Sequence, residues 1–367
     1  MRPRLRQMGL ALGDLPPGPY NAITDVPGVL VGHVSLNTGS GVLRPGQGPV
    51  RTGVTVVLPH GGNLFREKVP AAVHTINGFG KAAGFEQVRE LGVLEAPLAL
   101  TNTLNVGLAL DALVAYTVRQ SPEIGVSASS INIVVGETND GYLNDLQGRH
   151  VRSEHFFAAL ANAASGPLEL GAVGAGTGTV CYGWKGGIGS ASRQLPPDLG
   201  GYRLGVLLQS NFGASADLLL GGWPAGRYFQ PPVEPYSRPL DAGSVIIVLA
   251  TDAPLDASAL GRLCRRAQGG LARTGSHFAH GSGDFVIAFS TALRIPHNSP
   301  QPVAQRPILE DVRTLNTLFR AVSECVEEAV LDSLACAETV TGRDGHTAHA
   351  FPLEQALELF VKQRGAN

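Results

Sequence analysis

Gly243 and Ser244 stand directly before the apolar run 245–249, which predicts a buried strand. Self-cleavage through an N-to-O acyl shift needs a hydroxyl nucleophile directly after the scissile carbonyl, and a preceding glycine permits a strained peptide. After such a cleavage Ser244 carries a free α-amine, whose reference pKa of about 7.7 to 8.0 leaves part of it unprotonated near neutral pH. One residue then supplies a nucleophile and a candidate base. Gly-Ser pairs are also common in ordinary loops, so the setting of this pair decides its meaning.

A second serine, Ser282, lies in the stretch 280–284 just before the predicted strand 285–289. The stretch is no nucleophile elbow, because His280 and Asp284 occupy the places where that motif has glycines. Residues two apart share one face of an extended segment, so the Ser282 hydroxyl and the Asp284 carboxylate are placed to relay a proton to a nucleophile. The alternative is a glycine-serine turn with an acid at a strand edge.

Asn211 and Glu137 each follow a run that predicts a strand. The side-chain amide of Asn211 can donate to a developing oxyanion, and loss of one such donor costs about 2.7 to 4 kcal/mol of transition-state stabilisation in known enzymes. A partly desolvated Glu137 is the simplest receptor for the ammonium group of a substrate. The alternatives are an asparagine that ends a strand and a glutamate on the surface.

The richest glycine run spans residues 174–189 and invites comparison with phosphate-binding loops. The P-loop pattern fails because Lys185 is followed by Gly186, and the dinucleotide-binding pattern fails because Thr179 takes its last glycine position. Close backbone packing, around a site or between subunits, is the better interpretation.

Two histidine pairs have i,i+3 spacing, but neither has an acidic or cysteine neighbour in a known ligand arrangement; they are His277 with His280 and His346 with His349. The sequence therefore predicts no catalytic metal, and we expect no cofactor.

Composition excludes several classes of partner. With 44% hydrophobic and 16% charged residues, 47 glycines and 25 prolines, the chain of 367 residues is typical of a compact α/β enzyme. The net charge of −2 gives no field that attracts nucleic acid or anionic lipid. The basic start is not followed by a signal-peptide core, and no run reaches the roughly 18 apolar residues of a membrane span. Widely spaced cysteines predict free thiols, and we expect a cytoplasmic protein.

Apolar runs and helical periodicity alternate along the chain. Strands are predicted at 28–34, 54–58, 131–135, 204–208, 245–249 and 285–289, and helices at 80–91, 104–119, 154–164, 257–273, 308–336 and 353–364. Several strand runs lack polar alternation, which indicates sheets covered on both faces and a layered α/β sandwich. The proline-rich segment 221–243 predicts a long surface loop that delivers Ser244 to the first position of a strand.

The chain resembles the DmpA and BapA aminopeptidases of peptidase family S58, nearly from end to end. The matching stretches are 21–28, 77–81, 100–103, 136–141, 174–178, 185–189, 243–244, 281–284 and 342–346. The resemblance implies one four-layer αββα domain of the self-processing DmpA/ornithine acetyltransferase type. It also implies cleavage into 1–243 and 244–367, and homo-oligomers of such αβ pairs.

The resemblance further implies a role for each matching residue. Ser244 is similar in position to the family nucleophile, and Ser282 and Asp284 match the pair that assists it. Asn211 falls where the family has an oxyanion donor, and Glu137 where it has the receptor for the substrate's ammonium group.

Two departures from the family pattern affect this site. Asp284 is shorter than the glutamate that some members carry there. Some relatives add a tyrosine near the glutamate, and either Tyr142 or Asn139 stands in its place.

The function expected from these residues is that of an N-terminal serine hydrolase that releases N-terminal residues from short peptides, amino-acyl amides or esters. One alternative is an acyltransferase of the ornithine acetyltransferase type, although that fold typically uses threonine as nucleophile. The other is a non-catalytic binding or assembly member.

Overall fold

The computed structural model of the chain describes residues 2–232, 242–302, 307–308 and 311–364. Its two main sheets are mixed. The four-stranded sheet has the order β1-β2-β5-β6, formed by β1 (Leu30–Thr38), β2 (Val50–Leu58), β5 (Leu98–Asn102) and β6 (Val134–Thr138). The seven-stranded sheet has the order β13-β3-β12-β11-β10-β9, with β4 paired to β3. Its strands are β3 (Glu67–Gly78), β4 (Val93–Leu94), β9 (Ile188–Gln194), β10 (Arg203–Asn211), β11 (Ala242–Thr251), β12 (Gly281–Ser290) and β13 (Ile295–Pro296).

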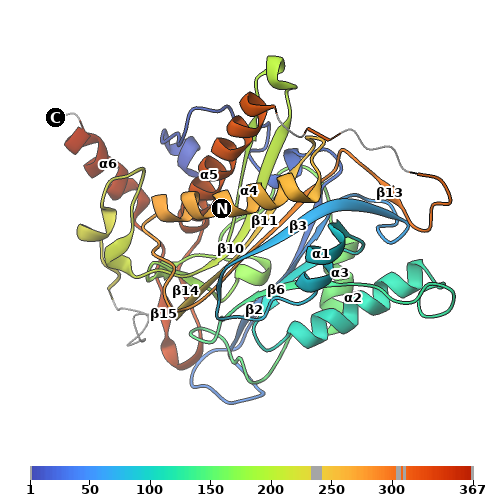
Figure 1. Cartoon of the computed structure of the whole chain (residues 1–367). Coiled ribbons are helices and arrows are strands. Elements are labelled where there is room, and N and C mark those ends of the chain that lie inside the picture. Colours follow the sequence, from blue (N-terminus) through green and yellow to red (C-terminus); the bar gives the residue numbers. More distant parts are fainter. Residues whose placement is uncertain (1, 233–241, 303–306, 309–310, 365–367) are drawn as a thin grey trace.

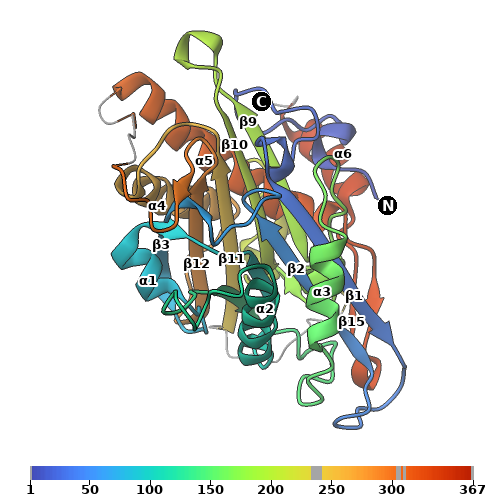
Figure 2. The ribbon, with the colours of Figure 1, turned by 90° about the vertical axis from the view of Figure 1, so that its right-hand side faces the viewer.

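The helices are α1 (Phe85–Leu91), α2 (Val106–Gln120), α3 (Ser153–Ala161), α4 (Ala257–Arg273), α5 (Val312–Ala335) and α6 (Leu353–Arg364). Of these, α2, α3, α4 and α5 lie on the outer faces of the two sheets (Figures 1 and 2). Helices α4 and α5 pack against β3, β9, β10 and β12, whereas α2 and α3 pack against strands of the smaller sheet. Strand β6 of the smaller sheet contacts β10 and β11 of the larger one, so the two sheets face each other.

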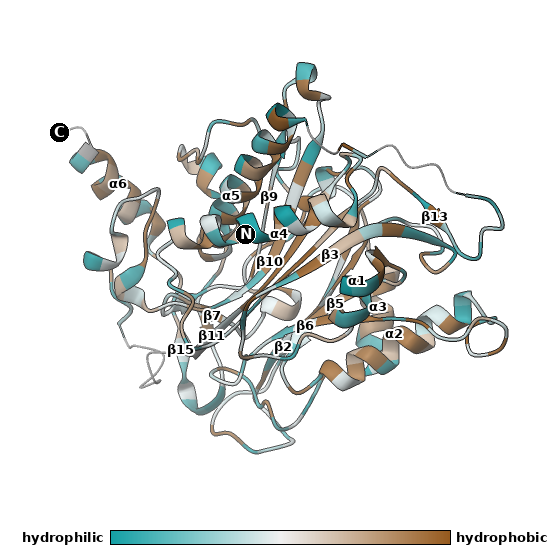
Figure 3. Cartoon of the chain, viewed as in Figure 1, coloured by the Kyte–Doolittle hydropathy of each residue, from teal (hydrophilic) through white to brown (hydrophobic). Residues whose placement is uncertain are grey.

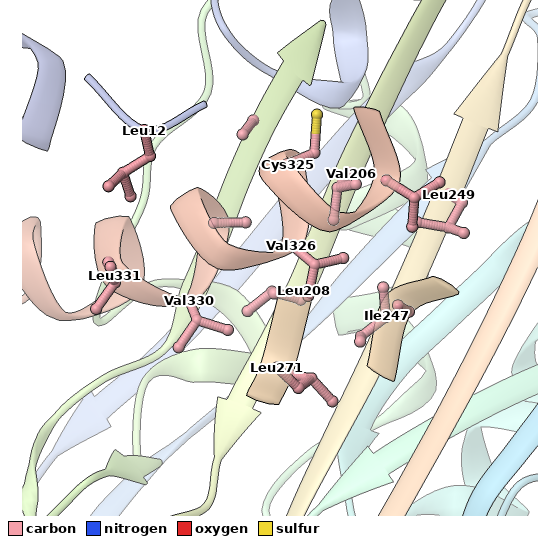
Figure 4. Packing of buried hydrophobic residues seen from close by; sticks show 14 of the residues in the cluster. Leu12, Val206, Leu208, Ile247, Leu249, Leu271, Cys325, Val326, Val330 and Leu331 are labelled. Carbon is pink, nitrogen blue, oxygen red and sulfur yellow. The ribbon is translucent and has the colours of Figure 1, made fainter. Parts of the chain in front are cut away.

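Strand β11 shows why its sequence lacks polar alternation. Val245, Ile247 and Leu249 belong to the core under α4 and α5, as Figure 4 shows for Ile247 and Leu249 beside Val326 of α5. Ile246 and its alternate neighbours belong to the second core, between the sheets. Both faces of the strand are therefore apolar. Figure 3 shows the same distribution, with hydrophobic residues concentrated along the central strands.

The predicted helices are confirmed, and two of them have the predicted bounds: 257–273 and 353–364. The others shift at their ends. The helix predicted from residue 80 begins only at Phe85, because Gly84 adopts a left-handed conformation with φ of 78°.

All six predicted strands are present, but β3, β5 and β9 were not predicted. β9 consists mostly of small or polar residues, and it is buried because α5 packs closely on it. A Cβ on Gly189 would lie 1.8 Å from the carbonyl oxygen of Ala329 in α5. Such strands form through their neighbours rather than through intrinsic propensity.

The prediction that Ser244 takes the first position of a strand is wrong. β11 begins at Ala242, because its parallel pairing with β12 already starts at Ala242 opposite Gly281. The Gly243-Ser244 bond thus lies inside a strand. The predicted loop 221–243 is also only partly a loop: Trp223 is stacked on Tyr228 and packs edge-on against Phe360 of α6. Residues 233–241 of that segment lie outside the described part of the chain.

Candidate active site

Three neighbouring central strands of the larger sheet bring Asn211, Ser244 and Ser282 together, because these residues lie at the strand ends on the same side of the sheet. In the antiparallel pairing of β10 with β11, Asn211 lies opposite Ser244. In the parallel pairing of β11 with β12, Ser244 lies opposite Gly283, and Gly243 lies opposite Ser282. Because β10 runs antiparallel to the other two strands, its last residue meets their first ones.

The side chain of Asn211 is directed at Ser244. Its Nδ2 donates a hydrogen bond to Ser244 Oγ at 3.3 Å, and both residues are buried. The backbone N–H of Val180, in the short strand β7 (Val180–Cys181), donates to Asn211 Oδ1 at 3.1 Å. This second bond fixes the orientation of the carboxamide, so that its NH₂ group faces the serine.

Ser282 and Asp284 form the pair that their spacing predicts. Ser282 Oγ donates to Asp284 Oδ1 at 2.6 Å, and both side chains are buried. Burial raises the pKa of Asp284 to about 6, while the hydrogen bond from Ser282 acts in the opposite direction. A Cβ on Gly243 would lie 3.1 Å from Ser282 Oγ, so this hydroxyl lies directly beside Gly243.

Asn77, at the end of β3, holds the turn that leads into β12. Its Nδ2 lies within hydrogen-bond distance of the carbonyl oxygens of Ala279 at 3.2 Å, His280 at 3.0 Å and Ser282, which share its two N–H bonds. The side-chain amide thereby fixes the backbone on which Ser282 stands.

Glu137 reaches the same region from the smaller sheet. It is the penultimate residue of β6 and is buried, and its Oε1 accepts the Lys81 N–H at 2.9 Å. Burial raises the pKa of Glu137 above its usual range, and the charge and N–H of Lys81 lower it. A Cβ on Gly80 would lie 3.3 Å from Glu137 Oε1 and 3.2 Å from Gly283 Cα. The carboxylate therefore lies close to the residue that pairs with Ser244.

The two candidate substitutes for the family tyrosine lie in different surroundings. Asn139 is exposed, and its Oδ1 accepts the Gly141 N–H at 2.9 Å in a local turn. Tyr142 stacks on His346 with ring centroids 4.7 Å apart and belongs to a small apolar cluster with Val180. Tyr142 is therefore near the peptide that orients Asn211, whereas Asn139 lies at the surface.

The structure thus gathers Ser244, Asn211, Ser282, Asp284 and Glu137 from four strands of two sheets. Three contributors were not found from residue types: the Val180 N–H, the Lys81 N–H and the Asn77 amide. Two of them act through the backbone and have no signature in the sequence. Asn77 and Lys81 appeared only in a stretch that resembles the family.

Other chemistries find less support among the described residues. No group of three or more histidine, cysteine, aspartate or glutamate side chains there is arranged to hold a metal ion. Burial raises the pKa of the thiols to about 12, which disfavours a cysteine nucleophile; they are Cys181, Cys264, Cys325 and Cys336. Within the same residues, no helix has the length and apolar character needed to cross a bilayer.

Comparison with known proteins identifies the family. The model of peptidase family S58 matches residues 21–348. The chain belongs to peptidase family S58. The residues described above therefore lie in a peptidase of this family.

Proteins similar to this chain cover almost its whole length. The β-peptidyl aminopeptidase BapA of Sphingosinicella microcystinivorans is 39% identical over 99% of this chain and 93% of its own. The crystal structure of the PH0078 protein from Pyrococcus horikoshii OT3 is 44% identical, with a TM-score of 0.93, over 100% of this chain and 99% of that one. The L-aminopeptidase D-Ala-esterase/amidase from Ochrobactrum anthropi is described as a prototype serine aminopeptidase with a variant of the Ntn hydrolase fold. It is 36% identical, with a TM-score of 0.87, over 99% of both chains.

Proposed function

We propose that this S58 peptidase is a self-processing aminopeptidase with Ser244 as its nucleophile. The observation that carries the proposal is the convergence on Ser244 Oγ: Asn211 donates to it, and Ser282 lies beside the preceding residue. Substrates are short peptides, amino-acyl amides or esters with a free N-terminal amine, as the names of the relatives suggest.

In the processing step, Ser244 Oγ gives up its proton and attacks the carbonyl carbon of Gly243, and the peptide nitrogen takes up a proton and leaves as the α-amine of Ser244. Water then hydrolyses the resulting ester, which yields chains 1–243 and 244–367 of one domain. The absence of a side chain on Gly243 suits this step, because a Cβ there would lie only 3.0 Å from the Cβ of Phe212.

In turnover, Ser244 Oγ attacks the first carbonyl carbon of a substrate whose ammonium group binds Glu137. The oxyanion accepts a hydrogen bond from Asn211 Nδ2. The serine proton passes to the Ser244 amine or through Ser282 to Asp284, and then to the departing amine. Water hydrolyses the acyl-enzyme and frees the N-terminal residue. Asn139 or Tyr142 completes the substrate site.

The proposed fold is the four-layer αββα sandwich of the DmpA/ornithine acetyltransferase type, assembled into homo-oligomers of αβ pairs in the cytoplasm. The packing of α4 and α5 on one sheet and of α2 and α3 on the other supports the layered arrangement. The peptidase family match supports hydrolysis over acyl transfer.

Denaturing electrophoresis tests self-processing. We expect two fragments from the purified protein and one band near 38.2 kDa from Ser244→Ala. A matched control is Ser40→Ala, since Gly39-Ser40 is another Gly-Ser pair but is exposed. The proposal fails if the unaltered protein stays intact, or if Ser244→Ala is cut as before.

Assays with amino-acyl nitroanilides test the turnover. The free-amine substrate should be cleaved and its N-acetylated form should not. Equal rates on both would contradict recognition of the ammonium group.

A further inference from the structure

Lys185 ends the short strand β8 (Trp184–Lys185) and has no exposed surface. Its Nζ donates to three backbone carbonyl oxygens: those of Gly176 at 2.9 Å, Thr179 at 2.8 Å and Gly186 at 2.6 Å. Three donors are the full set of an ammonium group, whereas a neutral amine has only two N–H bonds. The geometry is therefore that of a protonated, positively charged lysine.

This charge lies in the glycine-rich run 174–189, away from water. Burial lowers the pKa of Lys185 to about 7, while the Cys181 thiol and the Asp140 carboxyl act in the opposite direction, and the three carbonyl acceptors favour the charged form, which predominates below pH 7. An ammonium group is costly to bury, and its field is weakly screened there. The electric field of the ammonium group can therefore polarise the peptide groups next to it.

A continuous hydrogen-bonded path leads from Lys185 to Ser244. The Thr179 oxygen that accepts from Lys185 and the Val180 N–H belong to the same peptide group. That N–H donates to Asn211 Oδ1 at 3.1 Å, and Asn211 Nδ2 donates to Ser244 Oγ at 3.3 Å. The path thus runs from an ammonium group through one peptide and one carboxamide to the serine hydroxyl.

Each amide in this path passes on polarisation. A cation at the carbonyl oxygen draws electron density from the amide nitrogen, which makes its N–H a stronger donor, and the same shift repeats in the next amide. We propose that Lys185 is a positioning residue that orients and polarises Asn211 through the Thr179-Val180 peptide, and so strengthens its hydrogen bond to the oxyanion. This inference rests on the proposed function, in which Asn211 is the oxyanion donor.

A purely structural role is the competing explanation, because the same ammonium group also ties the glycine-rich run together. Gly176 packs so closely on the strand β9 that a Cβ would lie 2.5 Å from the nitrogen of Ile188. A structural role predicts loss of stability alone. A role through Asn211 predicts a loss of kcat that depends on Asn211 being present.

A double-mutant cycle with Lys185→Met and Asn211→Ala separates the two roles. We expect Lys185→Met to lower kcat on a free-amine nitroanilide roughly tenfold with little change in KM, a part of the 10²- to 10³-fold effect of a whole oxyanion donor. In the Asn211→Ala background the same substitution should lower kcat by less than about twofold. Equal fold losses in both backgrounds would overturn the proposal.

Two further variants keep the test decisive. Lys185→Gln keeps hydrogen-bond donors but removes the charge, so it can be measured if Lys185→Met does not fold. It should lower kcat, and full activity of this variant would overturn the proposal. Arg193→Met removes another fully buried cation, one that pairs with Glu324 and Glu328 under α5. It should lower the melting temperature and leave kcat unchanged. If Asn211→Ala itself leaves kcat unchanged, the proposed oxyanion site is wrong, whatever Lys185 does.

Discussion

Asp284 gives the activity a predicted pH dependence. Burial places its pKa at about 6 instead of near the ordinary aspartate value of 3.8. As a proton acceptor for Ser282 it works only when ionised, so activity should fall as the pH drops through 6. A group with this pKa is about 90% ionised at pH 7 and about 9% at pH 5, so kcat/KM should fall roughly tenfold between them. An ordinary aspartate would give almost no loss over that interval.

The assay follows kcat/KM from pH 4.5 to 9 on a free-amine nitroanilide and on 4-nitrophenyl acetate. The acetate is an activated ester that acylates a nucleophile without recognition of an ammonium group, and because it has no amine, titration of Glu137 does not affect its binding. We expect an acid limb near pH 6 on both substrates, and loss of that limb together with most of the activity in Asp284→Asn. The asparagine can still accept the hydrogen bond of Ser282 but cannot take up the proton.

The α-amine of Ser244 is the alternative base, and it would give a different pH dependence. If the α-amine of Ser244 is the base, the acid limb should lie at about pH 7.7 to 8.0, which is the reference pKa range of an α-amine. A limb there that persists in Asp284→Asn would refute the reasoning for the Ser282 and Asp284 pair.

Glu137→Gln should lower kcat/KM on free-amine nitroanilides about 10- to 100-fold, because a charge-assisted hydrogen bond is lost, and should leave the hydrolysis of 4-nitrophenyl acetate, which has no amine, unaffected. An equal loss on both substrates would contradict its role. Gly187→Ala should destabilise the fold by about 3 kcal/mol or more in thermal denaturation, since Gly187 has a φ of 147° and a Cβ would lie 1.8 Å from the Gly171 oxygen. In its control, Gly107→Ala, the exposed Gly107 in the first turn of α2 has open space around it, so the substitution should be neutral or stabilising by less than about 1 kcal/mol. Similar shifts in both variants would refute the steric argument.

Local patterns predicted a large part of the fold. Helix α4 has its predicted bounds because its apolar residues, among them Leu260 and Leu263, recur at helical spacing and face the core. Strand β9 was missed because it has small and polar residues, and only its neighbours make it a strand. The start of β11 was misplaced for the same reason, since pairing with β12 extends the strand over Gly243 and Ser244.

The sequence by itself determined the residue types, the spacing of Ser282 and Asp284, and the resemblance to a peptidase family that the family comparison confirms. Spacing sufficed for that pair because alternation within one strand is a local property. Only the tertiary structure showed that Asn211 lies opposite Ser244, because the register of β10 and β11 pairs residues far apart in the chain. The proximity of Glu137 to the same region likewise depends on how the two sheets pack. The link from Lys185 to Asn211 runs through a backbone peptide, which every residue possesses, so no sequence pattern could reveal it.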